Sequence, residues 1–106
     1  MPKFLVEASY TREGLAGVME KGGGSRRDAV AEMASGLGGH VECFYFGFGD
    51  NDAFVVVDLP DNEAAAAVAM AVGASGGAST RTTVLLTPEQ VDEAAERSVN
   101  YRPPGS

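Results

Sequence analysis

The chain has 106 residues, of which eight are Lys or Arg and fifteen are Asp or Glu, so its formal net charge is -7. This length suits one domain and excludes a doubly wound nucleotide-binding fold or an eight-stranded β/α barrel, both of which need more chain. The negative charge repels phosphate, so we expect neither nucleic acid nor an anionic membrane surface as a partner.

We expect a cytoplasmic protein without a targeting or membrane-spanning segment. A strand-like segment begins at Lys3, which leaves no room for a signal peptide. The longest weakly polar run, residues 64–73, is too short to cross a bilayer. The one cysteine, Cys43, cannot form an internal disulfide and fits a reducing compartment. We predict one domain over residues 1–98 and a flexible tail over residues 99–106.

The first part of the chain predicts a strand followed by two helices. Apolar residues alternate over residues 3–10, as in a strand with one buried face. Residues 11–21 have a short apolar helical face, which two glycines weaken and a further run of glycines ends. Ser25 is then expected to cap a clearer helix that ends at Gly38–Gly39.

The middle of the chain predicts a hairpin. Residues 40–48 read as a strand, residues 49–52 form a turn rich in Gly, Asp and Asn, and residues 53–59 read as a second strand. The run Val55-Val56-Val57 indicates that this second strand is buried on both faces and lies inside the sheet.

The last part predicts helix, strand and helix. Asp61 caps a helix with a stripe of small side chains, residues 80–86 form a strand, and Thr87 begins a helix that runs to about Ser98. The order β-α-β-β-α-β with a terminal helix predicts a ferredoxin-like α+β fold. Right-handed crossovers then give an antiparallel sheet of strand order 4-1-3-2, with both long helices on one face.

Several segments resemble the GYD domain family from about residue 3 to residue 96. They are Tyr10–Leu15, Gly23–Arg27, Phe44–Gly49, Val55–Ala64 and Leu85–Glu89. The resemblance implies a small bacterial or archaeal ferredoxin-like domain, related to the dimeric α/β barrels and without an established activity. Asn51 replaces the Tyr that usually precedes Asp in the motif that names the family, so any contact that this ring makes is lost here.

The second strand predicts a homo-oligomer. In strict alternation, Glu42, Phe44, Phe46 and Phe48 share one face of the strand, and Val41, Cys43 and Tyr45 share the other. Both sets are too apolar for a face that meets water, and a ferredoxin-like sheet covers only one face with its helices. We therefore expect a homodimer or higher oligomer, most simply a two-fold dimer. The alternative is that the terminal helix folds back over the open face.

Five polar residues could line a pocket on the sheet: Glu7, Ser9, His40, Glu42 and Arg81. In a dimeric barrel this face borders a cavity, where burial raises the pKa of a carboxyl group toward a useful range. The alternative, which we favour, is that Glu7 and Arg81 form an ordinary cross-strand ion pair.

Two single residues suggest chemistry but lack companions. His40 is the one histidine and the natural acid/base candidate, yet it begins a strand at a place that is usually exposed. Cys43 has aromatic neighbours and reads as a core thiol, which is inert. The run Asp50-Asn51-Asp52 imitates the start of a calcium loop, but the later ligands are missing, so we expect a hairpin turn and no metal.

The segment Ser25-Arg26-Arg27 is a candidate anion-binding site. It combines a flexible glycine run, a helix start and two guanidinium groups, although it lacks the lysine and spacing of a P-loop. An ordinary helix start is the simpler interpretation.

Taken together, these patterns favour a homo-oligomeric binding or structural module with no catalysis and no cofactor of its own. The alternatives are a cofactor-free dimeric α/β-barrel enzyme, of the oxygenase or isomerase kind, and a sensor of a small anion. The enzyme hypothesis rests on fold analogy and needs a cavity of a few hundred cubic ångströms on the sheet face.

Overall fold

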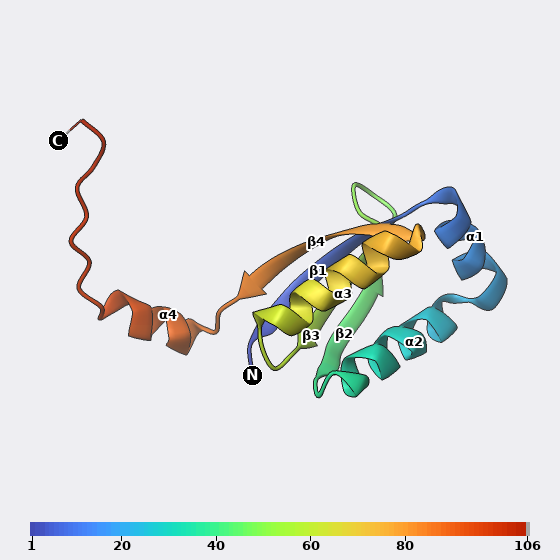
Figure 1. The fold of residues 1–106 in the computed structure, drawn as a ribbon, viewed down its shortest axis with the longest axis horizontal. Helices are drawn as coiled ribbons and strands as arrows, with labels where there is room; N and C mark the ends of the chain where they lie inside the picture. The colour runs from blue at the N-terminus through green and yellow to red at the C-terminus, as the bar shows by residue number, and fades with distance from the viewer. Residues whose placement is uncertain (106) are drawn as a thin grey trace.

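A computed structural model of the chain describes residues 1–105. The chain forms eight elements in the predicted order (Figure 1). They are β1 (Lys3–Tyr10), α1 (Arg12–Lys21), α2 (Gly23–Gly36), β2 (His40–Phe46), β3 (Ala53–Asp58), α3 (Asn62–Ser75), β4 (Ala78–Leu85) and α4 (Pro88–Ala95).

The strands form one antiparallel sheet of order β2-β3-β1-β4, which confirms the predicted strand order. β1 and β3 are the two inner strands, as the valine run of β3 predicts. Phe4 of β1 lies opposite Val57 on one side and Val84 on the other. The arrangement is α+β and agrees with the ferredoxin-like class.

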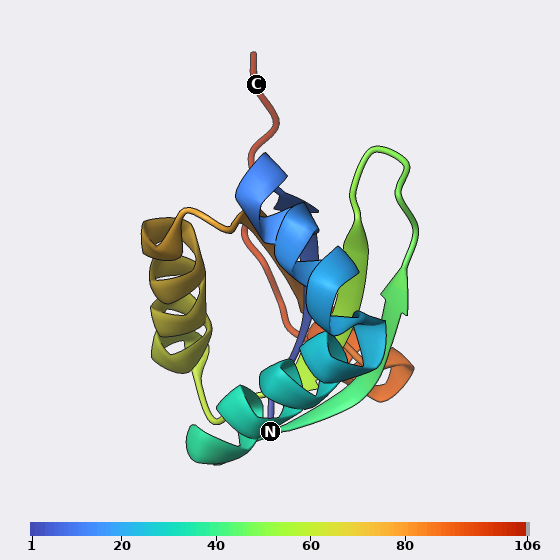
Figure 2. The ribbon, with the colours of Figure 1, turned by 90° about the vertical axis from the view of Figure 1, so that its right-hand side faces the viewer.

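The long helices α2 and α3 lie against the same face of the sheet, as predicted (Figures 1 and 2). Small residues at the contact allow this close approach, because Ala34 of α2 and Ala65 of α3 are both buried in the core. The largest fully buried side chains are Phe4 and Leu59. Hydrophobic burial between the helices and this face is therefore the main source of stability.

Three helices begin at a residue whose side chain caps the first turn. The side chains of Thr11, Asp61 and Thr87 accept hydrogen bonds from backbone N–H groups in the first turns of α1, α3 and α4. Thr87 and Gln90 also form the reciprocal capping box that their spacing predicts.

The start of α2 differs from the prediction, because Ser25 is not its cap. Gly22 occupies the capping position without a side-chain hydrogen bond, and Gly23 and Gly24 are already helical. Gly22 has a φ of +92°, and its N–H donates to the carbonyl of Val18, so it both ends α1 and begins α2. One glycine therefore makes the whole corner between the two helices.

A β-bulge interrupts the regular alternation of β2. Val41 lies opposite Val57 of β3 and Cys43 lies opposite Val56, so Glu42 has no partner on β3. A bulge inserts one extra residue into a strand, and every later side chain then changes face. Val41 therefore faces the helices while Cys43 and Tyr45 face away, so the predicted grouping of these three residues on one face is wrong. Phe44 and Phe46 share one face, as predicted.

The predicted face of Phe44, Phe46 and Phe48 lies toward the helices and ends with the strand at Phe46. Phe44 lines a cavity beneath the helices, and the ring of Phe46 packs against Gly23 at the start of α2. β2 ends at Phe46, earlier than predicted, and Phe48 has a φ of +55°, which is outside the extended region. The Phe46 and Phe48 rings stack with centroids 5.6 Å apart.

We call the face of the sheet away from α2 and α3 the open face. It carries alternate residues of β1 and the residues that lie opposite them in the register. These are Lys3, Leu5, Glu7, Ser9, His40, Cys43, Tyr45, Phe54, Val56, Asp58, Ser79, Arg81, Thr83 and Leu85.

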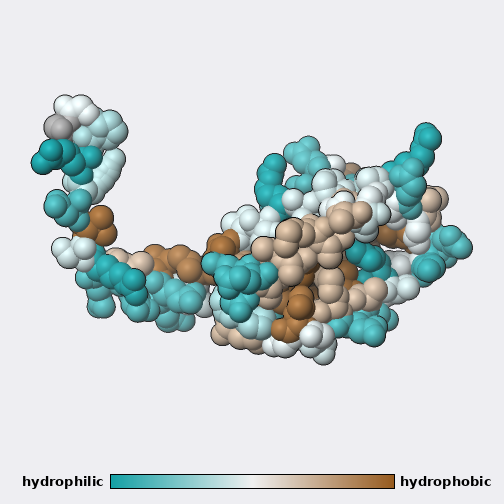
Figure 3. All heavy atoms as spheres, in the orientation of Figure 1, coloured by the Kyte–Doolittle hydropathy of each residue, from teal (hydrophilic) through white to brown (hydrophobic). Residues whose placement is uncertain are grey.

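The terminal helix α4 does not fold back over the open face. It projects from the body of the domain, and every one of its residues is exposed (Figures 1 and 3). It ends at Ala95, sooner than predicted. Residues 99–105 of the predicted tail contain no helix or strand, and Ser106 lies outside the described residues. Within residues 1–105, no helix has the length and apolar character needed to cross a membrane.

Candidate functional site

The polar residues of the open face gather into two separate clusters. The first, which we call the Asp58 cluster, contains Lys3, His40, Glu42 and Asp58. The Lys3 ammonium donates to both carboxylate oxygens of Asp58, at 2.9 and 3.1 Å, and lies 3.5 Å from Glu42. The His40 Nε2 lies 2.9 Å from Asp58 Oδ2. Asp58 is only 3% exposed, so a buried carboxylate orients both an amine and an imidazole at the surface.

The second, which we call the Asn51 cluster, contains Glu7, Ser9 and Asn51. The Asn51 amide donates to Glu7 Oε2 at 2.9 Å, and the Ser9 hydroxyl donates to Asn51 Oδ1 at 3.2 Å. The residue that replaces the aromatic ring of the motif thus ties the β2–β3 loop to β1. Asp52 supports the same junction, because its carboxylate accepts the N–H of Tyr10 at 2.8 Å.

Glu7 and Arg81 lie directly opposite each other in the β1–β4 register, as predicted. They form no ion pair within the described part of the chain, because the Glu7 carboxylate turns to Asn51 instead. The prediction that Glu7 and Arg81 form a cross-strand ion pair is therefore wrong. Ion pairs of this exposed kind contribute little, so a hydrogen bond from a nearby amide can replace one at small cost.

The five predicted open-face residues do not form one site. Lys3 of the first cluster and Glu7 of the second are four residues apart on β1, which separates them by about 13 Å along the strand. His40 and Glu42 lie at one end of the open face, Glu7 and Ser9 lie at the other, and Arg81 has no acidic partner in residues 1–105. Within residues 1–105, these side chains are held in fixed orientations but do not share one pocket.

Sequence reasoning missed Asp58 and Lys3, which organise the first cluster. One signal was available: Asp58 ends a run of three valines in an inner strand, and a carboxylate in such a place needs a partner. Its partners Lys3 and His40 are its cross-strand neighbours, one on each side. Pairing the strands before assigning sites would have brought these three residues together.

The charge on Lys3 predicts a loss of stability at high pH. The hydrogen bond from Lys3 to Asp58 raises the pKa of Lys3 above its ordinary value of 10.5, with further support from the negative charges of Asp58 and Glu42. A raised pKa adds stability that is fully present below the ordinary pKa and is lost as pH rises through the folded value. The free energy of unfolding from urea titrations should therefore fall above pH 10.5.

A Lys3→Met variant supplies the control for this pH dependence. It should be less stable than the wild type at neutral pH, and the difference between the two should shrink as pH rises above 10.5. A difference that stays constant through the alkaline range would contradict the role assigned to the Lys3 charge.

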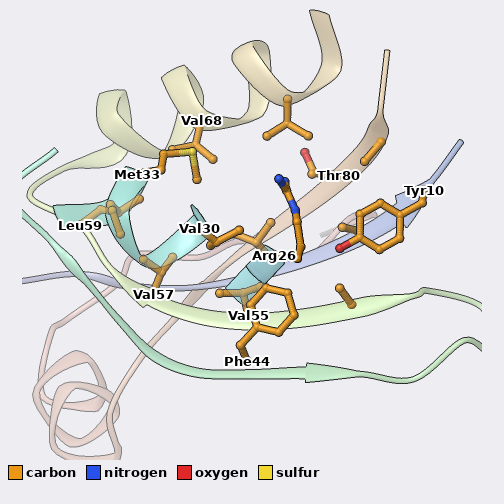
Figure 4. Close-up of a pocket in the computed structure, with 16 residues that line it drawn as sticks. Tyr10, Arg26, Val30, Met33, Phe44, Val55, Val57, Leu59, Val68 and Thr80 are labelled. Carbon is orange, nitrogen blue, oxygen red and sulfur yellow. The ribbon is translucent and has the colours of Figure 1, made fainter. Parts of the chain in front are cut away.

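The predicted anion site at the start of α2 separates into three different environments. Arg27 is exposed and lies 3.3 Å from Asp28, its neighbour in the chain. Ser25 lines an open cleft between the helices. Arg26 turns inward and lines both this cleft and a small cavity over the sheet (Figure 4). The helix start as a whole is therefore not an anion cradle, and only Arg26 enters a concave site.

Two hollows lie on the helix side of the sheet. The inner cavity measures about 50 Å³ and lies between β1, β3, α2 and α3. The outer cleft measures about 530 Å³ and runs between α1 and α2 on one side and α3 on the other. None of the five predicted open-face residues lines either hollow.

The remaining candidates are Cys43 and a possible metal site. Cys43 is a half-buried free thiol on the open face rather than a core thiol beneath the helices. Within residues 1–105, no three His, Cys, Asp or Glu side chains gather in an arrangement that could hold a metal ion.

The sequence matches the GYD domain family over residues 4–95, which covers nearly all of the folded elements. Comparison with curated proteins and with solved structures gives no match. The family match agrees with the segments that first indicated it, and the chain therefore belongs to the GYD domain family.

Proposed function

We propose that this GYD domain is a homodimeric, non-catalytic binding and structural module of the cytoplasm, in which the open faces of two copies pack together. The open face carries six half-buried or exposed apolar side chains that no helix covers. They are Leu5, Cys43, Tyr45, Phe54, Val56 and Leu85. An uncovered sheet face of this size and apolar character is the observation that carries the proposal.

The terminal helix supports a second copy as the occupant of this face. α4 has eight residues, whereas an isolated helix in water needs about 12–15 residues to be stable. Val91 is 51% exposed and shares one side of α4 with two alanines. Within residues 1–105, this apolar side has no surface to pack on (Figures 1 and 3). Two copies that meet through their open faces would offer one.

The arrangement of polar groups favours a module over a barrel enzyme. The Asp58 cluster and the Asn51 cluster lie at different levels of the open face. Leu5, Cys43 and Val56 lie between them, whereas Phe54 and Tyr45 lie level with Glu7. A dimer of open faces thus buries an apolar band that polar groups border, and apolar centres with polar borders are usual in protein interfaces. The enzyme alternative would require a cavity between the two copies with Glu7 or Glu42 inside it.

Light scattering coupled to size-exclusion chromatography tests the proposal. The wild type should elute as a species of twice the chain mass of 10.9 kDa. Val56→Lys places a charge in the middle of the open face, and Val91→Lys places one on α4. Because a buried unpaired charge opposes association, both variants should shift toward the monomer.

Met70→Lys is the matched control, since Met70 is 69% exposed on α3 and lies away from the open face. It should leave the oligomeric state unchanged, and circular dichroism should show that all three variants keep the fold. A wild type that stays monomeric at every concentration would overturn the proposal, and so would a Val56→Lys variant that dimerises as the wild type does.

A further inference from the structure

We propose that Arg26 binds the carboxylate of a small organic acid in the cleft between the helices, with the apolar part of that acid against the apolar side chains of the same cleft. This site lies on the side of the sheet opposite the proposed dimer interface. The inference is therefore independent of the oligomeric state.

Within residues 1–105, Arg26 has no partner of its own. Its Nε atom is buried and makes no hydrogen bond, and no carboxylate in residues 1–105 lies within ion-pair distance of its guanidinium group. A buried cationic donor without a partner is costly. The adjacent Arg27 shows the usual solution, since it extends to the surface and pairs with Asp28.

The cleft itself carries positive charge. Its lining, taken from the described residues, includes Lys21 and Arg26 but no Asp or Glu, although the chain as a whole carries a charge of -7. Hydroxyl groups of Tyr10 and Ser25 also line it. Positive groups and hydrogen-bond donors in a concave site without carboxylates select an anion.

The apolar wall of the cleft determines the kind of anion. Val18, Met33 and Val72 line the cleft together with Arg26. The inner cavity, at about 50 Å³, is smaller than the roughly 150 Å³ of a protein cavity that holds a benzene ring, so the apolar body lies in the cleft. One fork of donors beside an apolar wall fits a single carboxylate on an apolar body. Such a wall offers nothing to the other charges of a phosphate ester.

Titrations followed by amide chemical shifts test the site with four probes: benzoate, hexanoate, the neutral isostere benzamide, and inorganic phosphate. We expect one or both carboxylates to shift the amides of α2 and of the α3–β4 turn in the wild type. Benzamide and phosphate should bind at least about tenfold more weakly, since each lacks either the charge or the apolar body. If neither carboxylate binds at about 10 mM, or if benzamide binds as well as benzoate, the proposal is overturned.

Two neighbouring variants separate the site from general charge effects. Arg26→Met should weaken carboxylate binding about tenfold or more, whereas Arg27→Met should leave it unchanged. Without any probe, Arg26→Met should melt at the same temperature as the wild type or higher, because the variant removes an unpartnered buried donor. A lower melting temperature for Arg26→Met would assign Arg26 a structural role, and carboxylate binding unaffected by the substitution would place the probe elsewhere. Either result would overturn the proposal.

Discussion

Gly14→Ala is expected to lower the free energy of unfolding by about 1–3 kcal/mol. A methyl group at Gly14 would collide with the backbone carbonyl of Gly77, in the connection between α3 and β4. Backbone atoms cannot move aside as a flexible side chain can, so α1 would have to shift away from this connection. The N–H of Thr11 also donates to the Gly77 carbonyl at 3.0 Å, and the same shift would strain that bond. Urea unfolding followed by circular dichroism measures the change.

Gly17→Ala is the matched control because it lies one turn further along the same helix. No atom stands within 4 Å of the position that its new methyl group would occupy. Since Ala is a better helix former than Gly by up to about 1 kcal/mol, this variant should be as stable as the wild type or more stable. Equal effects at Gly14 and Gly17 would show that helix propensity, and not the close approach to Gly77, decides the outcome.

The fold could be predicted because its signals are local and repeated. Alternation in β1, the valine run of β3 and the caps at Asp61 and Thr87 each identify one element. Once the element order is known, the right-handed crossover rule leaves few topologies, and the observed strand order is among them.

The predictions of structure from sequence fail where one residue changes the register or direction of the chain. Nothing in the amino-acid sequence around Glu42 indicates the bulge, because a bulge is a property of two paired strands and not of one. That single insertion places Val41 on the helix side with Phe44 and Phe46 and separates it from Cys43 and Tyr45. Gly22 is a similar case, since three consecutive glycines predict a loop but only the first has positive φ.

The candidate site was less predictable than the fold, because it depends on which way long side chains turn. Arg26 and Arg27 are adjacent and chemically identical, yet one lines the inner cavity and the other pairs with Asp28 at the surface. Helical geometry places them about 100° apart, so only one can face the sheet. Assigning which one requires the position of the helix on the sheet, which pattern alone does not supply.

The largest effect on stability is expected for Phe4→Ala, at about 3–5 kcal/mol. Phe4 is 1% exposed and lies on an inner strand, in the same buried cluster as Val55, Val57 and Leu59. Truncation removes the burial of a large ring and leaves a cavity at the place where both helices meet the sheet. The packing around it can collapse only partly, because β1 is held between β3 on one side and β4 on the other. Urea unfolding monitored by circular dichroism should show a lower midpoint with an unchanged slope.

Phe48→Ala provides the same chemical change at a surface position and so isolates the effect of burial. Phe48 is 58% exposed, and its main contact is the stacked ring of Phe46. Its removal should cost no more than about 1.5 kcal/mol, the upper range for one aromatic pair. If the two variants were equally destabilised, the core would not lie between the sheet and the helices. The inner cavity beside Arg26 would then lose its structural basis, because the same packed face of the sheet forms its floor.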